Sequence, residues 1–357
     1  MSPLRKWGLR GFKTSSTPSL GELGTGSLEE GLITRNNNFC MDNQLFAKAY
    51  NLIKQADNIL VVTHDHPDGD AVASACLMAE IAKQAGKTYW LYCHSPINYQ
   101  GEFLPHLDEF KNFIENFEFD LIVVLDCGTV LRTKLEKEIL CRRTGQLVME
   151  IDHHPQVRAY ADLEIRNSAA ASTTEILYYF LRTNKIKITR DLANCVLTGI
   201  LTDTGNFLYP STSPQTINIA SEMLRLGARL PQIMENTWRN KSIASMKTWG
   251  KAMSNLQINK KYNFAFTVLK AEDVPEEVSE EELEGMAGFL SNLHDVNGIL
   301  LLRGLPSGEI KGSLRTAKTE VDISRLASAL GGGGHAKAAG FTIDGRLDKT
   351  GGGWKII

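Results

Sequence analysis

Short apolar runs that alternate with helical patterns are the feature that most constrains the fold of this 357-residue chain. Strands buried on both faces and separated by helices are typical of a mostly parallel sheet with helices packed against it. The carboxyl ends of parallel strands meet at one edge, which is where ligands bind in open α/β sheets. The runs lead into a polar group at that edge: 59–63 before His64, 120–126 ending in Asp126, and 146–152 ending in Asp152.

The first of these strand ends carries the segment 64–70, His-Asp-His-Pro-Asp-Gly-Asp, directly before a helical pattern over 71–85. This spacing places one imidazole and two carboxylates, those of His64, Asp68 and Asp70, at a single strand end. Such donors suit Mn²⁺, Mg²⁺ or Zn²⁺ better than a metal that prefers thiolates. Taken alone, the segment has a second interpretation, in which the two acids only cap the helix.

Further acids and imidazoles stand at the ends of other apolar segments, namely Asp126, the triplet Asp152-His153-His154, and Asp203. Unpaired charges are rarely buried, so several acids beside apolar runs indicate a cation that holds them together. With the first segment, the set exceeds what one tetrahedral site needs. Two divalent ions sharing a carboxylate would use it, and such a pair is suited to phosphoryl transfer. The alternative is that each acid is a cap or a surface residue.

A second signal is the glycine-rich segment 331–340, Gly-Gly-Gly-Gly-His-Ala-Lys-Ala-Ala-Gly. Consecutive glycines let the backbone approach a ligand and point N–H groups at an anion. His335 and Lys337 add donors and positive charge, and we expect a helical turn after the loop to add its amides. Arg315, at the end of a predicted strand, could bind a phosphate or a carboxylate. The alternatives are a linker for the glycines and a surface salt bridge for the arginine.

Composition restricts the partners of the chain. A net charge of −2 argues against a protein that coats long duplexes, which would carry a basic face. No apolar stretch approaches the roughly 20 residues of a membrane span, so we expect a soluble protein. The cysteines form no C-x-x-C pair and read as core residues of a protein in a reducing compartment. They are Cys40, Cys76, Cys93, Cys127, Cys141 and Cys195.

The order of predicted elements indicates two domains, a catalytic domain over 41–240 and a smaller α/β domain over 262–357, joined by a helical linker at 241–261. The boundary is placed at Asn259-Lys260-Lys261. Besides the runs above, strands are predicted at 88–93, 264–269, 298–303, 310–315 and 341–343. Helices are predicted at 44–56, 173–181, 192–201, 214–226, 243–256, 280–293 and 323–330.

Residues 1–40 differ from the rest, because they are rich in Gly, Ser, Thr and Asn and show no helix or strand period. We predict a disordered extension. Its first 20 residues contain basic but no acidic side chains, which resembles a transit peptide. The interpretation we favour is a translation start assigned too far upstream, with Met41 as the true first residue.

In their order along the chain, these motifs resemble the four motifs of the DHH phosphoesterase superfamily and its associated C-terminal domain. The resemblance covers nearly everything from residue 42 to the end, and the spacing is similar to the nanoRNase (oligoribonuclease)/pAp phosphatase subfamily. The motifs are His64-x-x-Pro67-Asp68-x-Asp70-Ala71, Asp126, Asp152-His153-His154, Thr202-Asp203-Thr204-Gly205, Gly312-Ser313-Leu314-Arg315 and Gly331–Gly340.

The resemblance implies a role for each motif residue. One metal would be bound by His64, Asp68 and Asp126. A second would be bound by Asp70, Asp126, His153 and Asp203, so that Asp126 bridges the two. Asp126, His154 and Asp152 would form the catalytic group, with His154 contacting the phosphate or protonating the leaving oxygen and Asp152 orienting the imidazoles. Arg315, Gly332, Gly333, Gly334 and His335 would bind the nucleotide end of the substrate.

The sequence departs from the family pattern at 166–169, which reads Arg-Asn-Ser-Ala where family members often have an Asp-Pro pair. We expect this loop to touch no predicted ligand. His66 falls on a variable position of its motif and reads as a loop residue. His94 and His106 have no partner pattern, and we expect both on the surface.

The function implied is a two-metal phosphohydrolase that acts on short oligoribonucleotides or on 3′-phosphoadenosine 5′-phosphate (pAp). The family's usual ion is Mn²⁺, with Mg²⁺ or Co²⁺ as alternatives. We expect a cytoplasmic enzyme without membrane or long-duplex partners, and a homodimer is compatible with the sequence. One alternative is a phosphodiesterase for cyclic dinucleotides of the c-di-AMP type. Another is a nucleotide-sensing module without catalytic activity.

Overall fold

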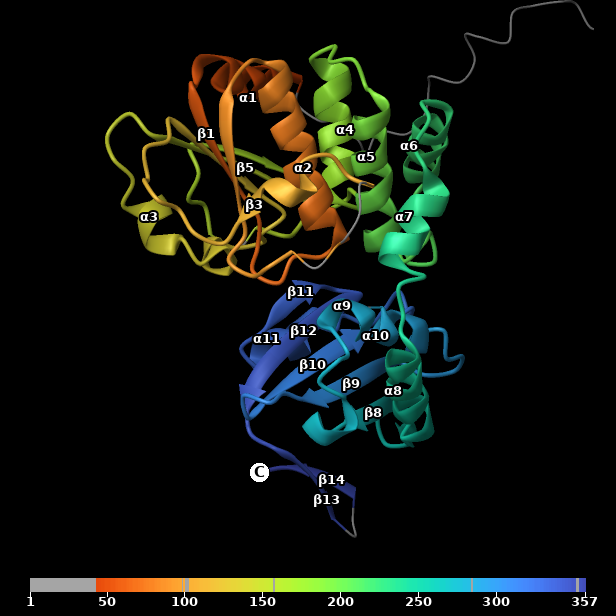
Figure 1. Ribbon diagram of the computed structural model, residues 1–357. Helices are drawn as coiled ribbons and strands as arrows, with labels where there is room; N and C mark the ends of the chain where they lie inside the picture. The colour runs from red at the N-terminus through yellow and green to blue at the C-terminus, as the bar shows by residue number, and fades with distance from the viewer. Residues whose placement is uncertain (1–42, 98, 100–102, 157, 284, 351–352) are drawn as a thin grey trace, which may run out of the picture. The chain divides into compact units, whose positions relative to one another are not determined.

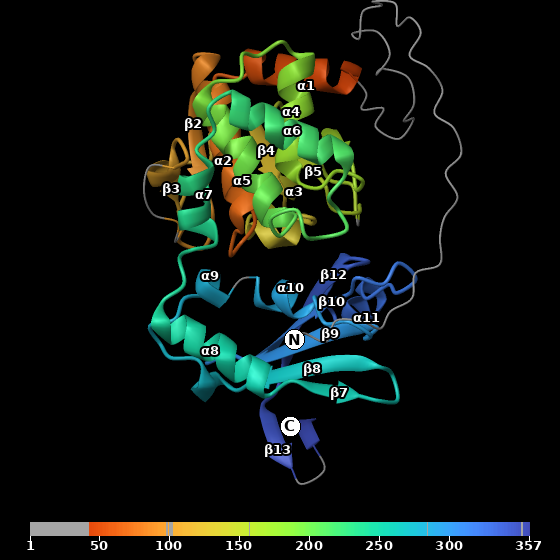
Figure 2. The same cartoon turned by 90° about the vertical axis from the view of Figure 1, so that its right-hand side faces the viewer.

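The computed structural model describes residues 43–97, 99, 103–156, 158–283, 285–350 and 353–357. The predicted extension over residues 1–40 lies outside this part of the chain. The described residues all belong to a single unit. This unit contains two six-stranded sheets and a two-stranded hairpin (Figures 1 and 2).

The first sheet is parallel throughout, in the order β3-β2-β1-β4-β5-β6, which confirms the predicted α/β class. The apolar runs form its centre. Both β3 and β6 are edge strands that our predictions did not include, because neither is a continuous apolar run. The strands are β1 Asn58–Val62, β2 Thr88–Tyr92, β3 Phe110–Lys111, β4 Leu121–Leu125, β5 Leu147–Asp152 and β6 Leu163–Arg166.

Helices cover one face of this sheet, and most of them lie where the periodicity predicts. The helix α2 is almost completely buried, because α4 and α5 pack against the side that does not face the strands. On the other face, α3 closes a core built on Leu60, Ile122 and Val148. The helices are α1 Asn43–Gln55, α2 Gly69–Gln84, α3 Glu136–Leu140, α4 Thr173–Thr183, α5 Arg190–Asp203, α6 Pro214–Arg225 and α7 Leu230–Thr237.

The second sheet has the order β11-β12-β10-β9-β8-β7, antiparallel except for the pair β8–β9. The predicted strands form its centre, and the short strands β7 and β11 complete it. The hairpin of β13 and β14 follows at the C-terminus. The strands are β7 Gln257–Asn259, β8 Phe264–Leu269, β9 Gly298–Gly304, β10 Glu309–Arg315, β11 Gly333–His335, β12 Ala338–Asp344, β13 Leu347–Thr350 and β14 Gly353–Ile356.

Two predicted features of this region differ from the structure. The helix predicted at 280–293 is interrupted, with α9 at Glu280–Leu283 and α10 at Met286–Leu290, because Gly285 adopts a left-handed conformation (φ +82°). The boundary predicted at 259–261 instead spans the last residue of β7 and the start of its connection to β8, within one sheet.

The predicted linker helix, α8 Ile243–Ser254, packs into the core of the second sheet through Trp249 and Ala252. The predicted helix at 323–330 is α11 Ser324–Ala329. None of the helices in the described part of the chain is long and apolar enough to cross a bilayer.

Candidate metal centre

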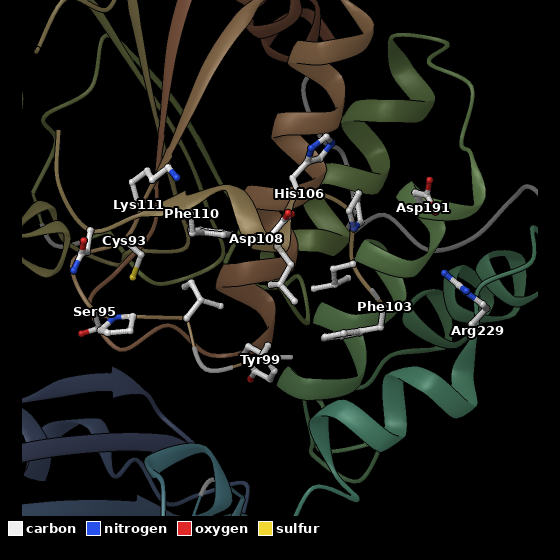
Figure 3. Close-up of a pocket in the computed structure, with 16 residues that line it drawn as sticks. Cys93, Ser95, Tyr99, Phe103, His106, Asp108, Phe110, Lys111, Asp191 and Arg229 are labelled. Carbon is white, nitrogen blue, oxygen red and sulfur yellow. The ribbon is translucent and has the colours of Figure 1, made fainter. Parts of the chain in front are cut away.

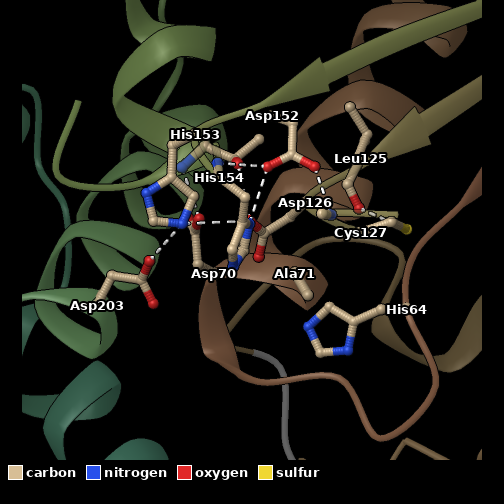
Figure 4. Close-up of polar contacts among 12 residues, drawn as sticks. His64, Asp70, Ala71, Leu125, Asp126, Cys127, Asp152, His153, His154 and Asp203 are labelled. Carbon is tan, nitrogen blue, oxygen red and sulfur yellow. Dashed lines mark hydrogen bonds and ion pairs between the residues drawn. The ribbon is translucent and has the colours of Figure 1, made fainter. Parts of the chain in front are cut away.

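The predicted site residues converge where the order of the first sheet reverses direction. Chain order runs outward from β1 through β2 to β3, then returns to β4 on the other side of β1. The loops that follow β1 and β4 therefore separate, and they leave room for a ligand at the carboxyl end of the sheet. The first of these loops carries His64 and the second Asp126, so the topology brings the two motifs together (Figure 4).

A first group of possible ligands consists of His64, Asp68 and Asp126, each offering one donor atom within 4.8 Å of the others. The His64 ring is held by a contact between Nδ1 and the carbonyl of Asp65 (2.9 Å). Its Nε2 is buried without a hydrogen-bond partner and lies 3.8 Å from Asp68 Oδ2. An orphaned buried nitrogen this close to a carboxylate suits a bound cation between them.

A second group consists of Asp70, His153 and Asp203. Asp70 is buried in the first turn of α2, and its carboxylate accepts the backbone N–H groups of Thr173 (2.6 Å) and Thr174 (3.1 Å). These amides open α4, where a helix N-terminus favours a negative charge. Across the group, His153 Nε2 lies 3.0 Å from Asp203 Oδ2 at the end of α5.

Asp126 connects the two groups. Besides belonging to the first, its Oδ1 lies 3.4 Å from His153 Nε2 and accepts a hydrogen bond from Thr173 Oγ1 (2.9 Å). The residue adopts a left-handed conformation (φ +59°), which is uncommon outside glycine and is found at functional turns. The structure therefore brings the predicted ligand residues close together, with Asp126 next to both groups; that they bind two ions with Asp126 shared stays a prediction.

Asp152 and His154 form a hydrogen-bonded pair beside this centre. Asp152 Oδ1 lies 2.8 Å from His154 Nδ1 and accepts the backbone N–H of the same residue (2.7 Å), while Oδ2 accepts the N–H of Gly128 (2.5 Å). Asp152 thus orients one of the two imidazoles that it was predicted to orient. The other, His153, has its Nδ1 3.4 Å from the carbonyl of Ala170.

The electrostatics of the cluster show why a cation fits there. Burial, together with the nearby charges of Asp126 and Asp203, raises the pKa of Asp70 well above its usual value. Burial also raises the pKa of Asp203 to about 6. Burial alone would lower the pKa of His153, but Asp203 raises it well above the ordinary range. Crowded carboxylates that retain protons are a site where divalent cations can replace those protons.

The glycine-rich segment is built differently from the predicted loop. Gly333–His335 is strand β11, paired with β12, and no helical turn follows it. A Cβ on Gly332 would overlap the backbone of Gly340 and Phe341, whereas one on Gly333 would meet open space. Close strand packing, rather than ligand approach alone, therefore requires part of this glycine run.

The predicted roles of two basic residues in the C-terminal domain also differ from what the structure shows or stay open. The ammonium group of Lys337 donates to the carbonyls of Lys318 (2.7 Å), Thr319 (2.8 Å) and Val321 (2.7 Å). Its three N–H donors therefore stabilise a loop and are not available to a substrate. Arg315 ends β10, and its Nη1 donates to the carbonyl of Leu314 (2.8 Å). Its predicted contact with substrate stays a prediction.

His335 lies against the two imidazoles of the metal centre. Its ring centroid is 5.0 Å from that of His153 and 4.9 Å from that of His154, on which it stacks at 23°. Burial and the two neighbouring imidazoles lower the pKa of His335 to about 3. The ring is therefore neutral, and its buried Nε2 has no hydrogen-bond partner in the described part of the chain.

Of the three other histidines that the sequence singles out, His94 is exposed as predicted, and His66 lies in a loop as predicted and is exposed there. The prediction is wrong for His106. Its ring is buried between Glu80 (2.8 Å) and Glu109 (3.0 Å), and Glu109 also accepts a hydrogen bond from Tyr89. Two carboxylates from separate elements compensate for the burial of one imidazole.

His106 also lines a cavity of about 890 Å³ outside the metal centre (Figure 3). Basic groups of Lys111 and Arg229 and acidic groups of Asp108 and Asp191 line it together. This mixture gives no preference for a phosphate, so the candidate site remains at the carboxyl edge of the sheet.

Several residues of the centre escaped the sequence analysis. The loop of Arg166 was expected to touch no predicted ligand; its Nη1 lies 3.7 Å from Asp152 Oδ2 and donates to the carbonyl of His154 (3.0 Å), two residues that are not predicted ligands but belong to the predicted catalytic group. Thr173 and Gly199 were read only as helix residues, although Thr173 contacts Asp126 and a Cβ on Gly199 would overlap Asp70. These are tertiary contacts, and no local pattern indicates them.

Comparisons with known proteins identify two domains in the chain. Residues 58–200 match the model of the DHH family, N-terminal domain, and residues 261–350 match the DHHA1 domain. The chain is 28% identical over 290 residues to a bifunctional oligoribonuclease and PAP phosphatase NrnA of Thermus thermophilus, covering 80% of this chain and 84% of that protein. The Bacillus subtilis protein of the same name is 27% identical over 292 residues, with 80% and 90% covered.

Among solved structures, an exopolyphosphatase-related protein from Bacteroides fragilis has the same fold, with a TM-score of 0.74 and 26% sequence identity. The superposition covers 85% of this chain and 92% of the other. Both halves of the chain are therefore present in known relatives in the same order.

Proposed function

From the premise that this chain belongs to the DHH family of metal-dependent phosphoesterases, with a DHHA1 domain after the catalytic one, we propose that it hydrolyses phosphate esters in very short oligoribonucleotides and in pAp. The relatives named oligoribonuclease and PAP phosphatase support this substrate class. The observation that carries the proposal is the pair of donor groups that meet at Asp126.

In this proposal His64, Asp68 and Asp126 hold one divalent ion, and Asp70, Asp126, His153 and Asp203 hold a second. Mn²⁺ is the ion that we propose, because it is the usual ion of the family that the chain resembles and carboxylate-rich donor sets suit it. When bound, the ions supply Lewis acidity, which neutralises charge on phosphoryl oxygens and acidifies water.

The remaining chemistry belongs to His154. Its Nδ1 is engaged by Asp152, so Nε2 is the ring nitrogen that can give a proton to the leaving oxygen. Burial alone would lower the pKa of His154, but hydrogen bonds to Asp126 and Asp152 raise it to about 9 in the protein without metal. In the metal-free protein the ring therefore holds a proton at neutral pH.

The C-terminal domain would bind the nucleotide end of the substrate through Arg315, the Gly332–Gly334 backbone and His335. Contact of His335 with His153 and His154 supports this role, because it places a C-terminal residue at the metal centre. The cytoplasm remains our predicted compartment for the enzyme.

A substrate panel with the purified chain tests the proposal. We expect Mn²⁺-dependent release of phosphate from pAp or of mononucleotides from di- to pentanucleotides, and Asp126→Ala should abolish it. The matched control is Asp120→Ala at the opposite end of β4, where the carboxylate accepts the N–H groups of Asp57 and Asn58. Cleavage of a cyclic dinucleotide alone, or Mn²⁺-dependent activity in Asp126→Ala, would contradict the proposal.

A further inference from the structure

A buried ion pair stands behind the metal centre, where the sequence departs from the family pattern. Glu150 is fully buried on β5, and Arg166 ends the neighbouring strand β6. Arg166 Nε donates to Glu150 Oε2 (3.0 Å) and Nη2 to Oε1 (2.5 Å), which is the bidentate geometry of a strong pair. The hydroxyl of Tyr160 donates to the same Oε1 (2.5 Å) and satisfies the carboxylate further.

The rest of the guanidinium points its donors at the loops of the metal centre. Nη1 donates to the carbonyl of His154 (3.0 Å) and Nη2 to the carbonyl of Gly128 (3.2 Å). The loop of Gly128 follows Asp126, and the loop of His154 follows Asp152. One side chain therefore ties together the ends of β4 and β5, which carry the shared carboxylate and the proton donor.

The carboxylate of Asp152 completes the connection. It lies 3.7 Å from Arg166 Nη1 and contacts both the backbone N–H and the ring Nδ1 of His154. A carboxylate bonded to one ring nitrogen fixes the orientation and tautomer of an imidazole, so a group that holds the carboxylate restrains the ring as well. A buried ion pair is a poor source of stability, since an apolar replacement often serves equally well, but its fixed directions can specify geometry.

We propose that Arg166, anchored by Glu150, is a positioning residue that fixes the His154 imidazole through Asp152 and the His154 carbonyl. The inference rests on the proposed function, because His154 acts there on the leaving oxygen. Arg166 touches neither substrate nor metal in this arrangement. Its effect on turnover passes through His154.

Arg166→Lys is the informative substitution. Lysine keeps a positive charge opposite Glu150, so the protein should fold, but it lacks the fork that reaches both loops. We expect kcat to fall about 10- to 100-fold, the range for groups that orient site residues. We expect KM to stay within about twofold, because uniform substrate binding is unchanged.

The matched control is Arg142→Lys. Arg142 pairs with Asp162 (2.8 Å) and donates to the carbonyl of Ile139 (3.2 Å), so it has similar partners in the same domain but no contact with Asp152 or His154. Its kcat should equal that of the parent. If the Arg166→Lys protein does not fold, Glu150→Gln is used as the test variant instead. It removes the carboxylate that anchors Arg166 with little change of side-chain volume.

A double-substitution cycle with His154→Ala separates positioning from general support of the fold. If Arg166 acts through His154, adding Arg166→Lys to His154→Ala should cause no further loss of kcat. An equal loss in both backgrounds would overturn the inference. An inactive parent enzyme would instead contradict the proposed function, so the two failures are distinguishable.

A second readout needs no activity. Long-range ¹H–¹⁵N spectra of the metal-free protein report the state of each imidazole nitrogen, and Arg166→Lys should shift the His154 ring signals. The buried ring of His106, held by Glu80 and Glu109, should not move and serves as the internal reference. Unchanged His154 signals would also overturn the inference.

Discussion

The carboxylates and imidazoles of the candidate metal centre are close enough to compete for protons. This competition determines how metal binding and stability depend on pH. Asp126 lies within 3.4 Å of nitrogens of both His153 and His154, while Asp203 pairs with His153. Protonation of both rings offsets part of the carboxylate charge. A divalent ion must then displace protons to bind.

Mn²⁺ binding should therefore strengthen as the pH rises. Burial raises the pKa of Asp203 to about 6, and burial with the charges of Asp126 and Asp203 raises the pKa of Asp70 well above its usual value. Both carboxyl groups must lose their protons before they can bind a cation. We expect the Mn²⁺ affinity to rise steeply between about pH 5 and 7 and to continue rising above it, because His153 also holds a proton. Calorimetry in buffers of different ionisation enthalpy should detect protons released on binding. An affinity independent of pH would contradict this balance.

The protonation of His154 gives a prediction of opposite sign for the metal-free protein. Burial alone would lower its pKa, and the hydrogen bonds to Asp126 and Asp152 raise it to about 9, above the value of about 6.5 in an unfolded chain. The protonated ring should thus stabilise the fold fully below about pH 6.5, and this contribution should be lost as the pH rises through about 9.

Comparing metal-free Asp152→Asn with the parent checks this sign. The NMR titration of His154 should move to lower pH in the variant, and the melting temperature should depend less on pH between about 6.5 and 9. A titration of His154 near pH 6.5 in the parent protein would show that the two carboxylates do not hold the proton.

Residue identity at the site could be predicted from the sequence because metal ligands have few chemical alternatives. Histidine and aspartate at strand ends indicate a cation wherever the strands lie in the sheet. Arg166 could not be found in this way, since its partners Glu150 and Asp152 are on another strand. The burial of His106 likewise depends on Glu80 in α2, which no local pattern connects to it.

At the scale of elements, the packing of α5 against α2 determines where Asp70 can lie. The two helices pack closely at Gly199, where an added Cβ would overlap Asp70 Oδ1 of α2 and Thr174 Oγ1 of α4. The Asp70 carboxylate is thus confined between the N-terminus of α4 and the backbone of α5. Glycine is required here by close approach, since no left-handed conformation is involved.

Gly199→Ala should destabilise the fold and weaken the metal site together. Overpacking of this kind typically costs about 1–3 kcal/mol, and the displaced Asp70 should lower the Mn²⁺ affinity. Gly250→Ala in α8 is the matched control, because a Cβ there meets open space. The control should gain up to about 1 kcal/mol from helix propensity. Urea unfolding and Mn²⁺ titration measure both effects, and a Gly199→Ala protein with parental metal affinity would contradict the packing argument.

The elements themselves were predictable to the extent that their signal is local. The runs at β1, β4 and β5 are apolar without interruption, because both faces of a central parallel strand are buried. Edge strands such as β6 and β11 lack that signal and depend on pairing with a distant partner. The break at Gly285 depends on a left-handed backbone conformation, which glycine permits but which a glycine in the sequence does not by itself predict.

At the scale of the whole molecule, a net charge of −2 limits the electrostatic attraction for nucleic acid. Proteins that bind long strands release many counterions, and their affinity falls steeply with salt. In the proposed function the substrate is instead gripped locally, by the metal centre and by the residues around His335. Affinity should then depend on a few phosphates only.

Salt dependence measured over a series of oligonucleotide lengths tests this argument. For a single strand, the slope of log K against log salt concentration becomes more negative by about 0.7 for each phosphate contact. With on the order of two such contacts, kcat/KM for a trinucleotide should fall less than about tenfold between roughly 50 and 200 mM salt. The slope should not steepen for a 24-mer, because added phosphates meet no further cations. A slope that steepens with oligonucleotide length would show that the chain binds long strands along its surface. The proposed preference for short substrates would then be wrong.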